Sequence, residues 1–241
     1  MTTGSSPYPD GYEPQRGRAS AVVVLLWVGI GFNALSVVSN WFLSSILDAM
    51  ARGESMGLSD SMLAIGASVI SLLGVLTFLG TAIAVCIWLH GAVKRQHFLD
   101  ESYVAVTPAA AVWSFFIPFV NLARPYTVVR DLLNASRYHV PLAADENPWK
   151  PEGAARFVGA WWACWLIGNI SGQISWQVSG SSLSAQAGAL YIDMFSDILH
   201  VGAAFLLIRI VRAIDSNQDD NARRQASTRL PQPEGLGPVI A

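Results

Sequence analysis

The sequence predicts an all-α fold: a polytopic membrane bundle of four transmembrane helices, with an interfacial or re-entrant broken helix between the second and the third. Three observations support this prediction. Of the 241 residues, 52% are hydrophobic and only 13% are charged, whereas a soluble domain carries about 25% charged residues. Several apolar runs reach the roughly 20 residues that an α-helix needs to cross a bilayer. The basic residues are concentrated in alternate segments between these runs, as in multi-pass membrane proteins.

The first two predicted spans cover residues 21–47 and 62–90. The run at 21–47 is longer than the roughly 7–15 apolar residues of a signal peptide, so we expect a retained helix that is tilted or projects from the bilayer. The run at 62–90 contains no charged residue before His90. Before both runs, residues 1–18 are rich in Gly, Ser and Pro, which predicts a disordered N-terminal tail.

The third and fourth predicted spans cover residues 154–178 and 188–211, with a serine- and glycine-rich turn between them. Together with the first two, they define one transmembrane domain over residues 19–212. From residue 213 onward the chain is polar and contains Pro and Gly. This composition predicts a disordered C-terminal tail over residues 213–241.

Residues 104–139 predict a broken helix. Thr107 is suited to cap a helix whose first turn begins with Pro108. Pro118 interrupts this helix because proline lacks an N–H and clashes one turn back, and Pro125 predicts the restart. Beyond it the side chains separate onto two faces, with Tyr126, Val129, Leu132 and Leu133 opposite Arg130, Asp131, Asn134 and Arg137. Such a helix lies in a membrane interface or on the end of a bundle.

The basic residues also predict the orientation. With four spans, every Lys and Arg except Arg52 lies on one side of the membrane, and the positive-inside rule makes that side the cytoplasm. If residues 104–122 crossed as a fifth span, the basic residues from Arg124 to Arg156 and the C-terminus would move outside, and the bias would be lost. We therefore expect a multi-pass protein of the cell (cytoplasmic) membrane with both termini cytoplasmic.

The residues around the helix break carry a family resemblance. Residues 117–126, IPFVNLARPY, contain a Pro-x-x-Asn-x-x-Arg-Pro-Tyr core, and VRDL follows at 129–132. With these residues the chain resembles the bacterial family called domain of unknown function 4328. The likeness extends back to residues 78–88 in the second span and forward to the tryptophan pair at 161–162 in the third. The resemblance implies a four-span bacterial membrane protein and supplies no activity.

The helix break is the first candidate site, and it comprises Pro118, Asn121, Arg124, Pro125 and Tyr126. In a structural interpretation, Asn121 caps the broken helix, and Arg124 pairs with Asp131 or bonds free carbonyl groups. A break at membrane depth needs such partners in any case, so we favour this interpretation. In a functional interpretation, Arg124 anchors a lipid phosphate or an anionic ligand and Tyr126 lies at the headgroup level.

Asp193, Asp197 and His200 form the second candidate, an intramembrane polar site. Their spacing of four and three residues places them on one face of the fourth helix, and Asp197 lies about 13 Å along it from Gly188. This distance places Asp197 close to the middle of the bilayer. An ionised aspartate there is unfavourable by about 2.5–3.5 kcal/mol, so it needs a partner inside the bundle. The partners that we expect are His200, Asn33, Asn40, Asn169 or Gln173.

Two interpretations of this acidic face remain. In the first, it is a proton relay or a cation site. In the second, Asp197 is protonated within a buried polar network, or the helix begins near Tyr191 and leaves Asp193 in water.

The sequence predicts no catalytic residue, metal site or cofactor. It has no nucleophile elbow, no His-Glu-x-x-His motif and no glycine-rich phosphate loop. Residues 29–34 have the spacing of a dinucleotide fingerprint but lie inside an apolar helix. Cys86 and Cys164 also lie in apolar runs, where free cysteine packs as a hydrophobe, and Cys86 with His90 lacks the further ligands that a metal needs.

We therefore expect an integral membrane protein with a structural, scaffolding or regulatory role and no chemistry of its own. Its expected partners are the lipid bilayer and either a membrane protein or a second copy of the chain. The formal net charge of -2 gives no reason to expect nucleic acid. The alternative function is proton- or cation-linked transport by the acidic face of the fourth helix, and an intramembrane enzyme ranks third.

Overall fold

The computed structural model describes residues 7–100, 104–137, 152–180 and 182–229, and these fold into helices joined by turns. This confirms the all-α part of the prediction. The six α-helices and one 3-10 helix are α1 (Arg16–Ala51), α2 (Leu58–Leu99), α3 (Pro108–Trp113), η2 (Val120–Leu122), α4 (Arg124–Arg137), α5 (Glu152–Val178) and α6 (Leu183–Arg229).

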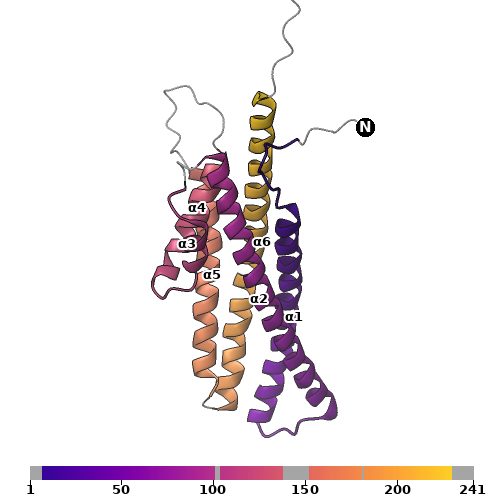
Figure 1. Cartoon of the computed structure of the whole chain (residues 1–241). Helices are drawn as coiled ribbons and strands as arrows, with labels where there is room; N and C mark the ends of the chain where they lie inside the picture. The colour runs from indigo at the N-terminus through magenta and orange to yellow at the C-terminus, as the bar shows by residue number, and fades with distance from the viewer. Residues whose placement is uncertain (1–6, 101–103, 138–151, 181, 230–241) are drawn as a thin grey trace, which may run out of the picture.

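The long helices run side by side (Figure 1). α1 packs along α6 and α2, and α5 packs along the other side of α6. The turns that join α1 to α2 and α5 to α6 lie at one end of the bundle, which we call the loop end. The start of α1, the ends of α2 and α6, and the short helix α4 lie toward the opposite end, which we call the terminal end.

Three of these helices, α1, α2 and α6, are long and apolar enough to cross a membrane, which indicates a membrane protein. They correspond to the first, second and fourth predicted spans. α5 forms over the third predicted span but is not one of the three. Its apolar run is interrupted by three amide side chains, those of Asn169, Gln173 and Gln177. The described residues thus contain three candidate spans instead of the four that the sequence predicts.

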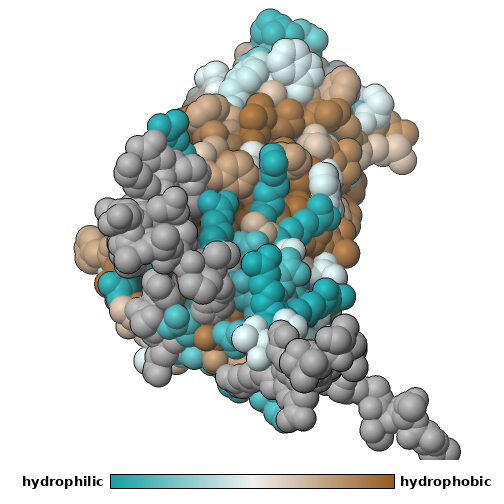
Figure 2. All heavy atoms as spheres, turned by 90° about the horizontal axis from the view of Figure 1, so that it is seen from above, coloured by the Kyte–Doolittle hydropathy of each residue, from teal (hydrophilic) through white to brown (hydrophobic). Residues whose placement is uncertain are grey.

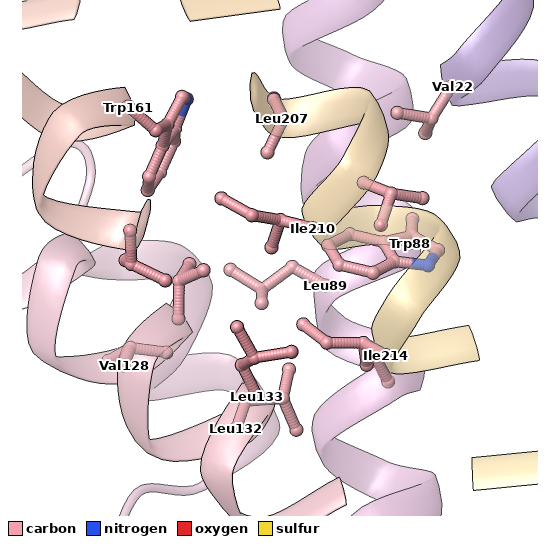
Figure 3. Packing of buried hydrophobic residues seen from close by; sticks show 14 of the residues in the cluster. Val22, Trp88, Leu89, Val128, Leu132, Leu133, Trp161, Leu207, Ile210 and Ile214 are labelled. Carbon is pink, nitrogen blue, oxygen red and sulfur yellow. The ribbon is translucent and has the colours of Figure 1, made fainter. Parts of the chain in front are cut away.

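The tightly packed core lies toward the terminal end (Figure 3). Leu89 of α2, Leu132 of α4, and Ile210 and Ile214 of α6 are almost completely buried within it. By contrast, the most apolar window of α2 contains no buried residue. Apolar surface of that extent indicates contact with a membrane or another protein.

α6 continues to Arg229, within residues 213–241, for which the sequence predicts a disordered tail. The polar half of α6 is held by the ends of two other helices. Asn221 donates to the carbonyl oxygen of Ser136 at 2.7 Å, and Gln225 donates to that of Leu99 at 3.2 Å. Since the last carbonyl groups of a helix have no partner within it, these contacts satisfy α4 and α2 while they fix α6.

The predicted N-terminal tail, residues 1–18, is also ordered in part. α1 begins at Arg16, and Tyr12 is buried before it. A cluster of polar contacts described below holds this segment against α2 and α6. Residues 1–6 and 230–241 of the two predicted tails lie outside the described residues.

The start of the predicted broken helix is confirmed. The side chain of Thr107 accepts a hydrogen bond from the N–H of Ala110 at 3.2 Å, and Pro108 is the first residue of α3. Serine, threonine and proline at these positions supply the first turn with an acceptor and a fixed φ. The sequence therefore determines this boundary locally.

The break itself is wider than predicted, since α3 ends at Trp113, before Pro118 is reached. The chain then turns at Phe119, whose φ of 65° is unusual for a residue other than glycine. α4 begins at Arg124, and it buries Val129 and Leu132 as expected. Residues 138 and 139, the last two of the predicted broken helix, lie outside the described part of the chain.

Candidate functional site

Asp193, Asp197 and His200 all lie on the wall of one cavity. The cavity has a volume of about 660 Å³, is partly open, and is lined by residues of α1, α2, α5 and α6 together with Phe115. The spacing of four and three residues predicts a shared helix face, and the three side chains do share one. This cavity therefore contains the second candidate site of the sequence.

The register of α1 on α6 determines which residues face the acidic side chains. Trp27 packs edge-on against Phe205, with ring centroids 6.5 Å apart, and Trp41 packs edge-on against Tyr191 at 6.4 Å. These pairs set the two helices antiparallel. They bring the polar stretch of α1 that contains Ser36 opposite the acidic stretch of α6.

His200 occupies a narrow space against α5. A Cβ atom added at Gly168 would lie only 3.0 Å from Nε2 of His200, so a glycine is needed for this close approach. One turn earlier, Ser196 donates to the carbonyl oxygen of Gly168 at 2.8 Å, and its hydroxyl lies 3.4 Å from Nδ1 of His200. Ser196 and His200 thus join α6 to the backbone of α5.

Asp197 retains a buried carboxylate oxygen, Oδ2, that has no hydrogen-bond partner. Three of its expected partners, Asn33, Asn40 and Asn169, line the same cavity, whereas Gln173 is exposed and does not. None of the three donates its amide group to Asp197. Each uses its amide nitrogen within its own helix, where the acceptors are Gly29 O at 2.8 Å, Ser36 Oγ at 3.3 Å and Trp165 O at 2.7 Å respectively.

The first candidate site, the helix break, is held from α5. The indole Nε1 of Trp162 donates to the carbonyl oxygen of Leu122 at 2.9 Å. Pro125 is buried, whereas Pro118 is exposed. Asn121 lies within η2, and Phe119 instead occupies the position before that helix. The expected cap by Asn121 is therefore not what holds the break, and the indole of Trp162 supplies the contact.

The expected pairing of Arg124 with Asp131 is wrong. Asp131 accepts from the neighbouring Arg130 at 2.8 and 2.9 Å, and this contact raises the pKa of Arg130 above its ordinary value. The Arg130 guanidinium also lies 5.5 Å from the ring centroid of Tyr126, a distance typical of a cation–π contact. Arg124 is exposed, so its side chain is accessible from outside the protein.

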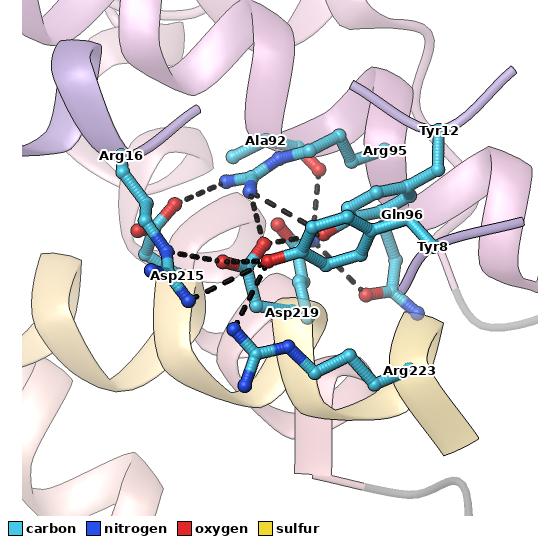
Figure 4. A network of polar contacts seen from close by, with 10 residues as sticks. Tyr8, Tyr12, Arg16, Ala92, Arg95, Gln96, Asp215, Asp219 and Arg223 are labelled. Atoms are coloured by element: carbon cyan, nitrogen blue, oxygen red, sulfur yellow. Dashed lines mark hydrogen bonds and ion pairs between the residues drawn. The ribbon is translucent and has the colours of Figure 1, made fainter. Parts of the chain in front are cut away.

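A third polar cluster lies at the terminal end, and the sequence analysis missed it (Figure 4). Arg95 of α2 is its centre: Nη2 lies 2.7 Å from Oδ1 of Asp215, and Nη1 lies 3.5 Å from Oδ1 of Asp219. Tyr12 donates to Asp219 at 2.9 Å, and Arg16 donates to the other oxygen of Asp219 at 2.9 Å. We call these five residues the terminal-end cluster.

The terminal-end cluster joins three parts of the chain through buried charges. The side chains of Arg95 and Asp219 are each only 4% exposed. Beside them, Gln218 donates to the carbonyl oxygen of Ala92 at 2.9 Å and to Gln96 at 3.1 Å. Burial raises the pKa of Tyr12 above its ordinary value, and the charge of Arg95 opposes this rise. Hydrophilic residues gather on this end of the molecule (Figure 2).

A helical period in the polar end of α6 could have revealed this cluster. Asp215, Gln218, Asp219 and Ala222 recur at intervals of three and four residues, which places them on one helix face. Four such residues after an apolar helix indicate a continuation of that helix. Amphipathic helices are usually recognised by large apolar side chains at this spacing. The packed face of α6 here consists mainly of polar side chains, so the helical period was not recognised.

Other candidate ligands are scattered. Among the residues that the structure describes, no group of three or more His, Cys, Asp or Glu side chains could hold a metal ion. Cys86 and Cys164 are free and half-buried, and His90 is exposed.

Residues 55–216 match the family model named Domain of unknown function (DUF4328). The chain belongs to this DUF4328 family. The matched residues include α2 to α5 and α6 as far as Ser216, so the acidic side chains of the cavity lie inside the DUF4328 domain, whereas all of α1 lies outside it. No curated protein and no solved structure matches the chain.

Proposed function

We propose that this DUF4328 protein is a four-span module of the cytoplasmic membrane with a structural or regulatory role and no chemistry of its own. In this proposal α5 is the additional span, and both termini are cytoplasmic. Its partners are the bilayer and either another membrane protein or a second copy of the chain.

The length of α5 and its position beside α6 support a fourth span. α5 has 27 residues, about 40 Å of helix, and it runs beside α6 over the part of the bundle that contains the spans. A crossing by α5 keeps every Lys and Arg except Arg52 on the side of the terminal end. Such a distribution follows the positive-inside rule.

The terminal-end cluster is the observation that best supports a structural or regulatory role. α6 has 47 residues, about 70 Å of helix, which exceeds a hydrocarbon core of about 30 Å. The projecting part is fixed to α2 and to the N-terminal segment by Arg95, Asp215 and Asp219. A stiff helical platform outside the bilayer is suited to binding a partner protein.

Transport is the second candidate function, and the cavity favours it. Asp193, Asp197 and His200 face one space at the depth of the spans, and ionisable groups there commonly mark proton or ion pathways. In that case these three residues exchange the proton or cation as it crosses.

Flux measurements separate the two proposals. The full-length protein is reconstituted into phosphatidylcholine vesicles that contain a pH-sensitive dye for proton gradients, or a Na⁺- or K⁺-sensitive dye for gradients of those cations. The proposed role predicts the same dissipation in protein-containing and empty vesicles, with no change in Asp197→Asn. A flux that the protein adds and that Asp197→Asn abolishes would contradict it and establish the transport candidate.

A further inference from the structure

The cavity of the second candidate site is long, and its polarity changes along its length. Its α1 wall extends from Leu25 to Leu43, which are about 27 Å apart along a helix. Toward the loop end the wall holds most of the polar side chains, including Ser36, Asn40, Asp193 and Asp197, beside apolar ones such as Leu43 and Leu190. Toward the terminal end it is apolar, and its side chains include Val85, Phe115, Trp161, Trp165 and Leu207. A space of this shape matches a molecule with a polar head and an apolar chain.

The polar part of the cavity offers acceptors in excess of donors. Asp193 and Asp197 contribute carboxylates, beside which lie the hydroxyls of Ser175 and Ser36 respectively, and Oδ2 of Asp197 is buried without a partner. The amide nitrogens of Asn33, Asn40 and Asn169 each donate one hydrogen bond within their own helices, and their amide oxygens can accept hydrogen bonds. Among the described residues that line the cavity, none is Lys or Arg.

This imbalance specifies the chemistry of an occupant. A buried carboxylate at membrane depth requires a cation or a hydrogen-bond donor. The four apolar runs of a second copy contain Lys or Arg at only two positions, Arg156 and Arg209, both toward the terminal end, so a second copy does not offer a cation beside the acidic face. A neutral lipid lacks the charge that would complement two aspartates.

We propose that the cavity is a binding site for a cationic amphiphile. Its protonated amine pairs with Asp197 and Asp193, and its apolar chain extends between α2 and α5 toward Trp165. The volume of about 660 Å³ is within the roughly 300–1,000 Å³ of small-molecule sites. This inference goes beyond the proposed function, since binding is expected whether or not the protein carries a flux.

Quenching of tryptophan fluorescence tests the site. The full-length protein in phosphatidylcholine vesicles is mixed with dodecylamine that carries a nitroxide at the end of its chain, and unlabelled dodecylamine is added as competitor. Because Trp161 and Trp165 line the apolar part of the cavity, bound probe quenches their emission. The proposal predicts a saturable component of quenching that unlabelled dodecylamine removes and dodecanol does not.

Variants assign the binding to the carboxylates. Asp197→Asn should require an about tenfold higher dodecylamine concentration for the same competition, because it removes the charge of the pair. Asp197→Glu should retain binding, and Glu54→Gln, in the exposed turn after α1, should not change it. Ala204→Leu, which narrows the apolar part of the cavity, should weaken binding without touching a carboxylate.

Two results would overturn the proposal. One is equal competition by dodecanol and dodecylamine, which would indicate partition into lipid or a neutral ligand. The other is unchanged binding in both Asp197→Asn and Ala204→Leu, each verified as folded by circular dichroism. Neither result bears on the flux experiment, so the two proposals fail separately.

Discussion

The guanidinium of Arg95 and the carboxylate of Asp215 lie 2.7 Å apart although 120 positions separate them in the sequence. The side chain of Arg95 is 4% exposed and that of Asp215 is 13% exposed. When one partner of a buried ion pair is removed, the other charge remains without compensation. This contact therefore makes the polar end of α6 depend on the end of α2.

Arg95→Ala should lower the free energy of unfolding by about 3–5 kcal/mol, because it leaves the largely buried carboxylate of Asp215 without its ion-pair partner and removes one of the cations beside Asp219. Denaturant titration in detergent micelles, followed by circular dichroism, measures this change. The matched control is Arg52→Ala, since the pair of Arg52 with Glu54 has side chains 64% and 61% exposed. Exposed pairs contribute about 0–1 kcal/mol, and equal losses in both variants would contradict our account of the cluster.

Gly168→Ala should destabilise the protein by about 1–3 kcal/mol, which is typical of overpacking a well-packed site. The added methyl group would lie 3.0 Å from Nε2 of His200, so the imidazole ring has to move. Gly80→Ala is the control, because a Cβ atom there meets nothing within 4 Å. Alanine also favours helix over glycine, so Gly80→Ala should be neutral or stabilising. The same denaturant titration compares the two, and because alanine favours the helix at both positions, Gly168→Ala should be the less stable variant. Equal changes in the two variants would contradict the close approach of His200 to Gly168.

The stability of the protein should fall at high pH because of Tyr12. Its pKa in the folded state lies above the ordinary value of 10.0, chiefly through burial. A group with a raised folded pKa contributes stability that is complete below its unfolded pKa and is lost as the pH rises toward the folded one. Unfolding midpoints measured from about pH 8 to about pH 11 should therefore decrease above about pH 10. Tyr12→Phe should flatten this decrease, and identical profiles for the two proteins would refute the assignment.

The parts of the fold that depend on local signals could be predicted from the sequence. Long apolar runs predicted the helices α1 and α2, and Thr107 as a cap predicted the start of α3. The shared face of Asp193, Asp197 and His200 follows from helical spacing alone. In each case the physical cause lies within a few residues of the feature that it determines.

The parts that depend on distant partners could not be predicted. The helical extension to Arg229 rests on Ser136, Leu99 and Arg95, whose proximity to α6 is a property of the whole bundle. Composition alone indicated disorder there, because polar residues pack only when such partners exist. Arg124 and Asp131 are seven residues apart in α4, about 10 Å along the helix axis, and Asp131 pairs instead with the neighbouring Arg130.

Accessibility of introduced cysteines tests most directly whether α5 crosses the membrane and both termini lie on one side. In a background with Cys86→Ala and Cys164→Ala, single cysteines replace Gly53 and Gly180 at the loop end, and Arg137 and Ser227 at the terminal end. An impermeant maleimide should label Gly53→Cys and Gly180→Cys in intact cells, and Arg137→Cys and Ser227→Cys only after the membrane is opened. Labelling of Arg137→Cys from outside intact cells, or protection of Gly180→Cys while Gly53→Cys is labelled, would contradict the four-span arrangement.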